Sequence, residues 1–118
     1  MQQDVREINL EIGKPAVAEA LDRMRMELRL SKKRGYAAVK LIHGFGSSGT
    51  GGKIRVAVRR ELAAMCERGA VRMVIPGEKL TIFEEDTRKL LQICPEFRRD
   101  RDLERHNNGI TVVVIKKT

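Results

Sequence analysis

The chain has 118 residues, which is enough for one domain with its own hydrophobic core and too short for an enzyme with a separate substrate lobe. Apolar residues make up 42% of the chain and charged residues 34%, a composition that is typical of a folded globular protein and excludes an intrinsically disordered one. No apolar run approaches about 18 residues, and the N-terminus lacks the pattern of a signal peptide. The sequence therefore predicts a cytoplasmic protein that does not contact a membrane.

The positive charge is concentrated in two short segments. The formal net charge of +8, from 24 basic and 16 acidic residues, equals the charge of segments 29–34 and 53–60, which contain no acidic residue. These segments carry Arg29, Lys32, Lys33, Arg34, Lys53, Arg55, Arg59 and Arg60. A local positive patch favours a polyanion, and nucleic acid is the most common polyanion in the cytoplasm. The alternative is a solvated helix face that keeps the protein in solution. With one tyrosine, three phenylalanines and no tryptophan, base stacking on an aromatic sheet is not expected.

Local patterns predict two strands and a helix in the first part of the chain. Residues 1–6 are expected to be disordered. The alternation of apolar and polar residues over 8–12 predicts a half-buried strand, and the apolar spacing between Pro15 and Arg34 predicts a helix. The mostly apolar run 36–42, bounded by glycines, predicts a central strand.

A glycine-rich segment opens the second part of the chain. Residues 43–53 predict a loop, and the apolar spacing after Ile54 predicts a helix that ends at Gly69. A strand is expected over 70–75, then a helix that begins near Phe83 and is stopped by Pro95, and a last strand over 110–115. Charges of both signs alternate over 98–105 and predict an exposed loop.

This order, β-α-β-α-β-(α)-β, predicts a single α/β domain over residues 1–118. Strands separated by helices pair in parallel through right-handed crossovers, so we expect a two-layer sandwich with a four-stranded mixed sheet. The glycine-rich loop then lies at the carboxyl end of the second strand, where open sheets place their ligand sites.

Two nucleotide-binding motifs fit this loop poorly. Residues 51–53 resemble the end of a P-loop, but Ser47 stands where the first glycine is needed and Ile54 where a magnesium-binding hydroxyl is needed. Glycines at 44, 46 and 49 have the spacing of a dinucleotide fingerprint, but the loop continues beyond them and the chain is too short for the second half of that fold. A nucleotide-binding domain is therefore the least favoured alternative.

An anion cradle fits the loop better. Glycine amides can turn toward one phosphate because no side chain blocks the approach, and the positive end of the next helix points to the same place. Lys53 and Arg55 in the first helical turn oppose the helix macrodipole by about 0.3–1 kcal/mol each, which a bound anion would offset. The alternative is a flexible connector with no ligand.

These segments resemble the Smr (small MutS-related) domain family. Its motif, a strand ending in IIHG, an HGxGxG loop and a helix beginning LRxxVxxxL, is similar to residues 41–46 and 51–62, with an apparent four-residue lengthening between them. Its closing motif GGxGxTxVxL is similar to residues 107–115, and the resemblance covers residues 8–116. Two departures are visible. The opening family motif L-D-L-H-G has neither its acid nor its histidine in Ile8-Asn9-Leu10-Glu11-Ile12, and residues 77–106 look inserted.

The resemblance implies a fold, an activity and site residues. The family fold is a two-layer sandwich whose last strand lies antiparallel beside the second strand. Family members bind DNA or RNA, and several nick it as endonucleases. The expected contacts with the sugar-phosphate backbone are Gly44, Gly46, Ser47, Ser48, Gly49, Gly51, Gly52, Lys53, Arg55, Arg59 and Asn108.

Cleavage would depend on two histidines. Antiparallel pairing of the last strand would bring His106 near His43, and two imidazoles beside a phosphate could act as general acid and base. A lone histidine is also common as a hydrogen-bonded structural residue. No acidic cluster has the spacing of a metal site, and Cys66 and Cys94 are interpreted as buried free thiols, so no metal or cofactor is expected. The alternative to a nucleic-acid-binding domain is a non-catalytic protein-interaction module.

Overall fold

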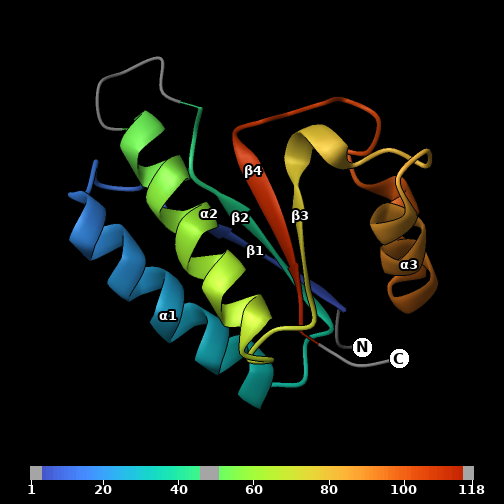
Figure 1. The fold of residues 1–118 in the computed structure, drawn as a ribbon, viewed down its shortest axis with the longest axis horizontal. Helices are drawn as coiled ribbons and strands as arrows, with labels where there is room; N and C mark the ends of the chain where they lie inside the picture. The colour runs from blue at the N-terminus through green and yellow to red at the C-terminus, as the bar shows by residue number, and fades with distance from the viewer. Residues whose placement is uncertain (1–3, 46–50, 116–118) are drawn as a thin grey trace.

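The computed structural model describes residues 4–45 and 51–115, which form a mixed sheet between helical layers (Figure 1). The strands and helices are β1 (Val5–Asn9), α1 (Val17–Lys33), β2 (Ala38–Ile42), α2 (Gly51–Glu67), β3 (Met73–Pro76), α3 (Glu85–Ile93) and β4 (Ile110–Val114). Two short 3-10 helices, η1 (Gly77–Lys79) and η2 (Pro95–Arg99), flank α3.

The sheet has the strand order β1-β2-β4-β3. β1 pairs in parallel with β2, whereas β4 is antiparallel to both β2 and β3. The prediction of a four-stranded mixed sheet with an antiparallel last strand is therefore confirmed. Because Ile42 is paired with Ile110, the end of β2 lies beside the beginning of β4.

Helices α1 and α2 cover one face of the sheet (Figure 1). Met24 and Leu28 of α1 are one turn apart, as are Val58 and Leu62 of α2, so each helix turns an apolar stripe toward the strands. This layer packs on alternate residues of the sheet, such as Val113. These helices and the sheet form the two layers expected from the sequence, to which the segment between β3 and β4 adds a third.

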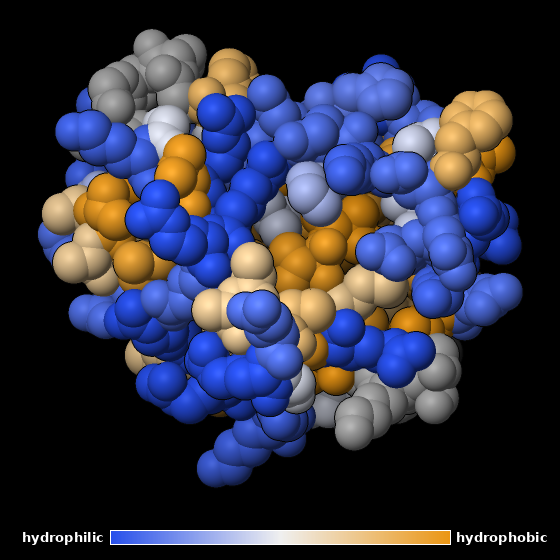
Figure 2. Space-filling view, viewed as in Figure 1, coloured by the Kyte–Doolittle hydropathy of each residue, from blue (hydrophilic) through white to orange (hydrophobic). Residues whose placement is uncertain are grey.

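The segment between β3 and β4 covers the opposite face. Leu90 and Leu91 of α3 and Phe97 of η2 pack against Ile75 and Val112 of the sheet. The central strands β2 and β4 are therefore buried on both faces, which explains why every residue of β4 except Thr111 is apolar. Figure 2 shows hydrophilic residues over most of the molecule in this view, with hydrophobic residues gathered in a hollow near its middle.

Three local expectations differ from the structure. β1 begins at Val5, so it includes two of the six residues expected to be disordered, and α2 begins at Gly51, inside the expected loop. Residues 98–105 are not a freely exposed loop, because Asp102 is buried and Leu103 packs on the apolar residues between α3 and the sheet. In the part of the chain that the structure describes, no helix is both long and apolar enough to cross a membrane.

Candidate functional site

The HG motif, His43-Gly44, follows β2 and is hydrogen-bonded to the residue that precedes β4. The amides of His43 and Gly44 both donate to the carbonyl oxygen of Gly109, each at 3.0 Å. Gly44 has a φ of +78°, a left-handed conformation that favours glycine. Both amides already have an acceptor inside the protein, so main-chain contacts with an anion would have to come from residues further along the loop.

The ring of His43 is fully buried, and both of its nitrogens are hydrogen-bonded. Nδ1 lies 2.8 Å from the Gly44 carbonyl oxygen, and Nε2 lies 2.8 Å from Oγ1 of Thr111. Arg59 Nε, which can only donate, lies 3.1 Å from the same hydroxyl oxygen. Because the Gly44 carbonyl can only accept, Nδ1 carries the proton of a neutral His43 ring. Nε2 then accepts from the Thr111 hydroxyl, whose oxygen in turn accepts from Arg59.

The electrostatics agree with a neutral ring. The pKa of His43 is lowered to about 4, chiefly by burial and also by the charges of Arg59 and Arg55, which together outweigh the hydrogen bond to the Gly44 carbonyl that raises it. At pH 7 this histidine is uncharged, and neither nitrogen is free to exchange a proton with a ligand. In this geometry His43 positions the loop.

The guanidinium of Arg59 forms its hydrogen bonds with other residues of the protein. Its guanidinium binds the carboxylate of Glu78 through two hydrogen bonds of 2.7 and 2.8 Å and also donates to the carbonyl oxygens of Asn108 and Ile110. Burial alone raises the pKa of Glu78, but the hydrogen bond and charge of Arg59 outweigh it, and the net pKa is lowered. Arg59 thus ties α2 to β4 and η1, so its predicted contact with phosphate would compete with these bonds.

The remaining predicted residues near β4 are exposed. His106 has an exposed ring, and its Nδ1 lies 3.2 Å from the carbonyl oxygen of Glu78. The hydrogen-bond partner of His106 therefore lies in η1, whereas those of His43 are Gly44 and Thr111. Asn108 is also exposed, and its carbonyl accepts from Arg59.

The first turns of α2 carry the free positive charge. Lys53 and Arg60 are exposed and Arg55 is half-buried, and within the described part of the chain none of the three forms an ion pair or a side-chain hydrogen bond. The first turn, which begins with Gly51 and Gly52, has no acidic residue. The other predicted contacts, Gly46, Ser47, Ser48 and Gly49, lie outside the described residues.

A carboxylate that the sequence reasoning did not place at this site lies against the loop. A methyl group built on Gly44 would overlap Oε1 of Glu11, so the two residues are in close contact. Glu11 follows β1 and Gly44 follows β2, and neighbouring parallel strands end at the same edge of a sheet. The parallel order of the first two strands could therefore have predicted this contact. The charge of Glu11 disfavours an anion at this end of the loop.

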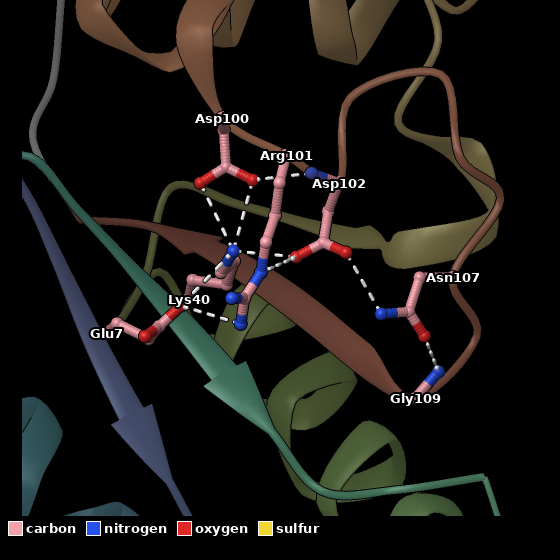
Figure 3. A network of polar contacts seen from close by, with 7 residues as sticks. All are labelled: Glu7, Lys40, Asp100, Arg101, Asp102, Asn107 and Gly109. Carbon is pink, nitrogen blue, oxygen red and sulfur yellow. Dashed lines mark hydrogen bonds and ion pairs between the residues drawn. The ribbon is translucent and has the colours of Figure 1, made fainter.

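A buried ion-pair network lies behind the site (Figure 3). Lys40, in the central strand β2, is 2% exposed, and its Nζ lies 3.0 Å from Asp100, 2.6 Å from Asp102 and 3.2 Å from Glu7. Burial alone lowers the pKa of Lys40, but the hydrogen bonds and charges of Asp102 and Asp100 outweigh it, and the net pKa is raised. The sequence reasoning treated Lys40 as part of an apolar strand and missed this network.

The network leads from Lys40 to the HG motif. The second carboxylate oxygen of Asp102 accepts from the side-chain amide of Asn107 at 2.9 Å, and Asn107 Oδ1 accepts from the amide of Gly109 at 2.9 Å. The carbonyl of Gly109 holds His43 and Gly44. The segment after η2 is therefore connected to His43 and Gly44 by a continuous chain of polar contacts, which Figure 3 shows as far as Gly109.

Comparison with known proteins gives a similarity to one solved structure. No protein-family model matches the sequence, and no curated protein sequence matches it. The crystal structure of the Smr domain of Thermus thermophilus MutS2 is similar to this chain, with a TM-score of 0.58 and 20% sequence identity. The match covers 95% of this chain and 99% of that one. At this level of identity the likeness is one of fold.

Proposed function

We propose that this chain, which has the fold of an Smr domain, binds the sugar-phosphate backbone of nucleic acid with the first turns of α2. The family resemblance supplies the class of ligand. Support for the surface comes from three cations in the first three turns of α2, none of which forms an ion pair within the described part of the chain.

The position of these cations carries the proposal. Lys53, Arg55 and Arg60 lie in the first three turns of a helix whose N-terminal end is already positive, an arrangement that disfavours the helix by about 0.3–1 kcal/mol for each charge in the first turn. A phosphate would offset this cost and accept hydrogen bonds from amides of the first turn, which have no acceptor within an α-helix. Arg59 does not join this set, because Glu78 neutralises it.

Contacts of this kind predict little sequence selectivity. Phosphate contacts fix the position of a protein on nucleic acid without reading its bases. The affinity should fall steeply between about 50 and 200 mM salt, because each neutralised phosphate releases counterions.

Charge reversal of the two exposed cations tests the proposal. Lys53→Glu with Arg60→Glu lowers the net charge from +8 to +4. The matched control, Arg98→Glu with Arg105→Glu, makes the same change at exposed positions outside α2. We expect the α2 variant to bind a labelled single-stranded oligonucleotide at least about tenfold more weakly, with a salt dependence reduced by about two ions.

The comparison of the two variants decides the result. Equal losses in the test and control variants would show that only net charge matters. Unchanged binding in the α2 variant would reject the proposal and favour the protein-interaction module instead.

Endonuclease activity is the second candidate function. Two exposed side chains near the HG motif, those of Glu11 and His106, favour it. Both ring nitrogens of His43 are hydrogen-bonded within the protein. The carboxylate of Glu11, in contrast, lies against Gly44, and the ring of His106 is exposed in the segment before β4. Nicking of supercoiled plasmid by the wild type and its loss in both Glu11→Gln and His106→Ala would support cleavage. Equal nicking by all three proteins would point to a contaminant.

A further inference from the structure

A second basic surface lies at the other end of the helical layer. We call it the α1/α2 cleft, a depression of about 310 Å³ between the C-terminal halves of the two helices. Its rim carries Arg29 and Lys32 of α1 and Arg68, which directly follows α2, and the Arg25–Glu61 ion pair spans it. Its apolar lining comes from Leu28, Met65, Val71 and Ile115.

Helical spacing explains how the two walls are built. Arg25, Arg29 and Lys32 recur at four- and three-residue steps along α1, so their side chains share one face. On the facing wall, Met65 of α2 and Arg68, whose amide still donates to Ala64 of the helix, are likewise three residues apart. The cleft is therefore a product of two helix faces meeting, with charge on the rim and aliphatic side chains below.

The rim charges have no partner in the described residues. Arg29, Lys32 and Arg68 form no ion pair or side-chain hydrogen bond there, in contrast to Arg25, which binds Glu61. Cations near helix C-termini interact favourably with the macrodipole, which accounts for part of their placement. The macrodipole does not account for an apolar depression enclosed by them.

The cleft is separate from the candidate nucleic-acid surface. Lys53 lies in the first turn of α2 and Arg68, fifteen residues later, directly follows its last turn, which places their main chains about 22 Å apart at about 1.5 Å per residue. Grooves for single strands use aromatic side chains on which bases stack, and none of the residues lining this cleft is aromatic. Its chemistry fits carboxylates above an aliphatic anchor.

From this combination we propose that the α1/α2 cleft docks an acidic peptide segment with an aliphatic side chain. The carboxylates of the segment meet Arg29, Lys32 and Arg68, and its aliphatic side chain enters the lining near Leu28 and Met65. The volume lies at the lower end of the range for ligand sites, about 300–1,000 Å³, and suits one or two side chains. The proposal does not depend on nucleic-acid binding by α2.

A pair of synthetic peptides tests both parts of the site. The first is a short glutamate-rich peptide with two leucines, and the second is the same peptide with alanine in place of each leucine. Titrated into the full chain labelled with nitrogen-15, the leucine peptide should shift the amide signals of residues 25–32 and 61–71. It should bind at least about tenfold more tightly than the alanine peptide, because burial of the leucines adds hydrophobic free energy.

Charge reversal then tests the rim. Arg29→Glu with Arg68→Glu should weaken the leucine peptide at least about tenfold, whereas Arg98→Glu with Arg105→Glu, which has the same net charge, should retain it. Three results would overturn the proposal: equal binding of the two peptides, equal losses in the two variants, or no shift of the cleft signals by either peptide. Displacement of the leucine peptide by an oligonucleotide that shifts the same signals would also overturn it, by assigning the cleft to nucleic acid.

Discussion

Replacing Lys40 by methionine tests whether the buried network stabilises the fold and the loop together. The change keeps an unbranched side chain of similar length and removes the charge. The side chains of Lys40 and Asp102 are 3% and 8% exposed, so the variant leaves the Asp102 carboxylate buried without its closest cation. Breaking a buried pair by removing one partner costs about 3–5 kcal/mol. The hydrogen bond from Asn107 remains, so we expect a loss near the lower figure, about 3 kcal/mol.

The pH dependence of this loss has a definite sign. Burial alone raises the pKa of Asp102, but hydrogen bonds from Asn107 and Lys40 and the charge of Lys40 outweigh it, and the net pKa lies below the ordinary 3.8. A lowered carboxyl pKa stabilises the fold above the unfolded-state pKa, and this stability is lost as the pH falls through the folded-state pKa. The wild type should therefore lose its advantage over Lys40→Met in strong acid.

Urea unfolding at neutral and acid pH measures this difference. Lys33→Met, at an exposed position, is the control and should change the free energy of unfolding by less than about 0.5 kcal/mol. Adding Asp102→Asn to Lys40→Met should cost less than the sum of the single changes, because the two groups interact. The amides of His43 and Gly44 should also exchange faster in Lys40→Met. A loss below about 1 kcal/mol that does not vary with pH would refute the reasoning.

Three further predictions concern the loop and its supports. The pKa of His43 is about 4, below its ordinary 6.5, so stability should fall by up to about 3 kcal/mol as the pH drops from 6.5 toward 4; a ring that titrates near 6.5 by NMR would contradict this. Arg59→Met should raise the pKa values of His43 and Glu78, since the Arg59 charge lowers both, and unchanged NMR titrations would exclude the proposed coupling. Gly77→Ala should lower the free energy of unfolding by about 1–3 kcal/mol, because the new methyl group would overlap the main-chain oxygen of Asn107, which cannot rotate away. A variant that unfolds thermally at the same temperature as the wild type would contradict this prediction.

The local pattern of the sequence determined most of the helices and strands. Apolar spacing identified α1 and the body of α2, and the apolar runs before Ile42 and after Gly109 identified β2 and β4. These signals are short-range, because each depends only on which residues recur at helical or strand spacing. The order of elements and the family resemblance then placed His43 and Gly44 at the end of the second strand, next to the beginning of the last one, as the structure confirms.

Only the tertiary structure decided which polar groups are free. The acids at 100 and 102 looked like part of an exposed loop, yet they neutralise Lys40, which is sixty and sixty-two residues away in the sequence. Arg59 and Lys53 look alike in the sequence, but only Arg59 meets an acid, Glu78, from another element. A side chain gains its partner when distant segments pack together, and neither periodicity nor composition records that distance. The sequence therefore determined where the candidate site lies, while the packing of the β3–β4 segment decided which charges of that site already have partners inside the protein.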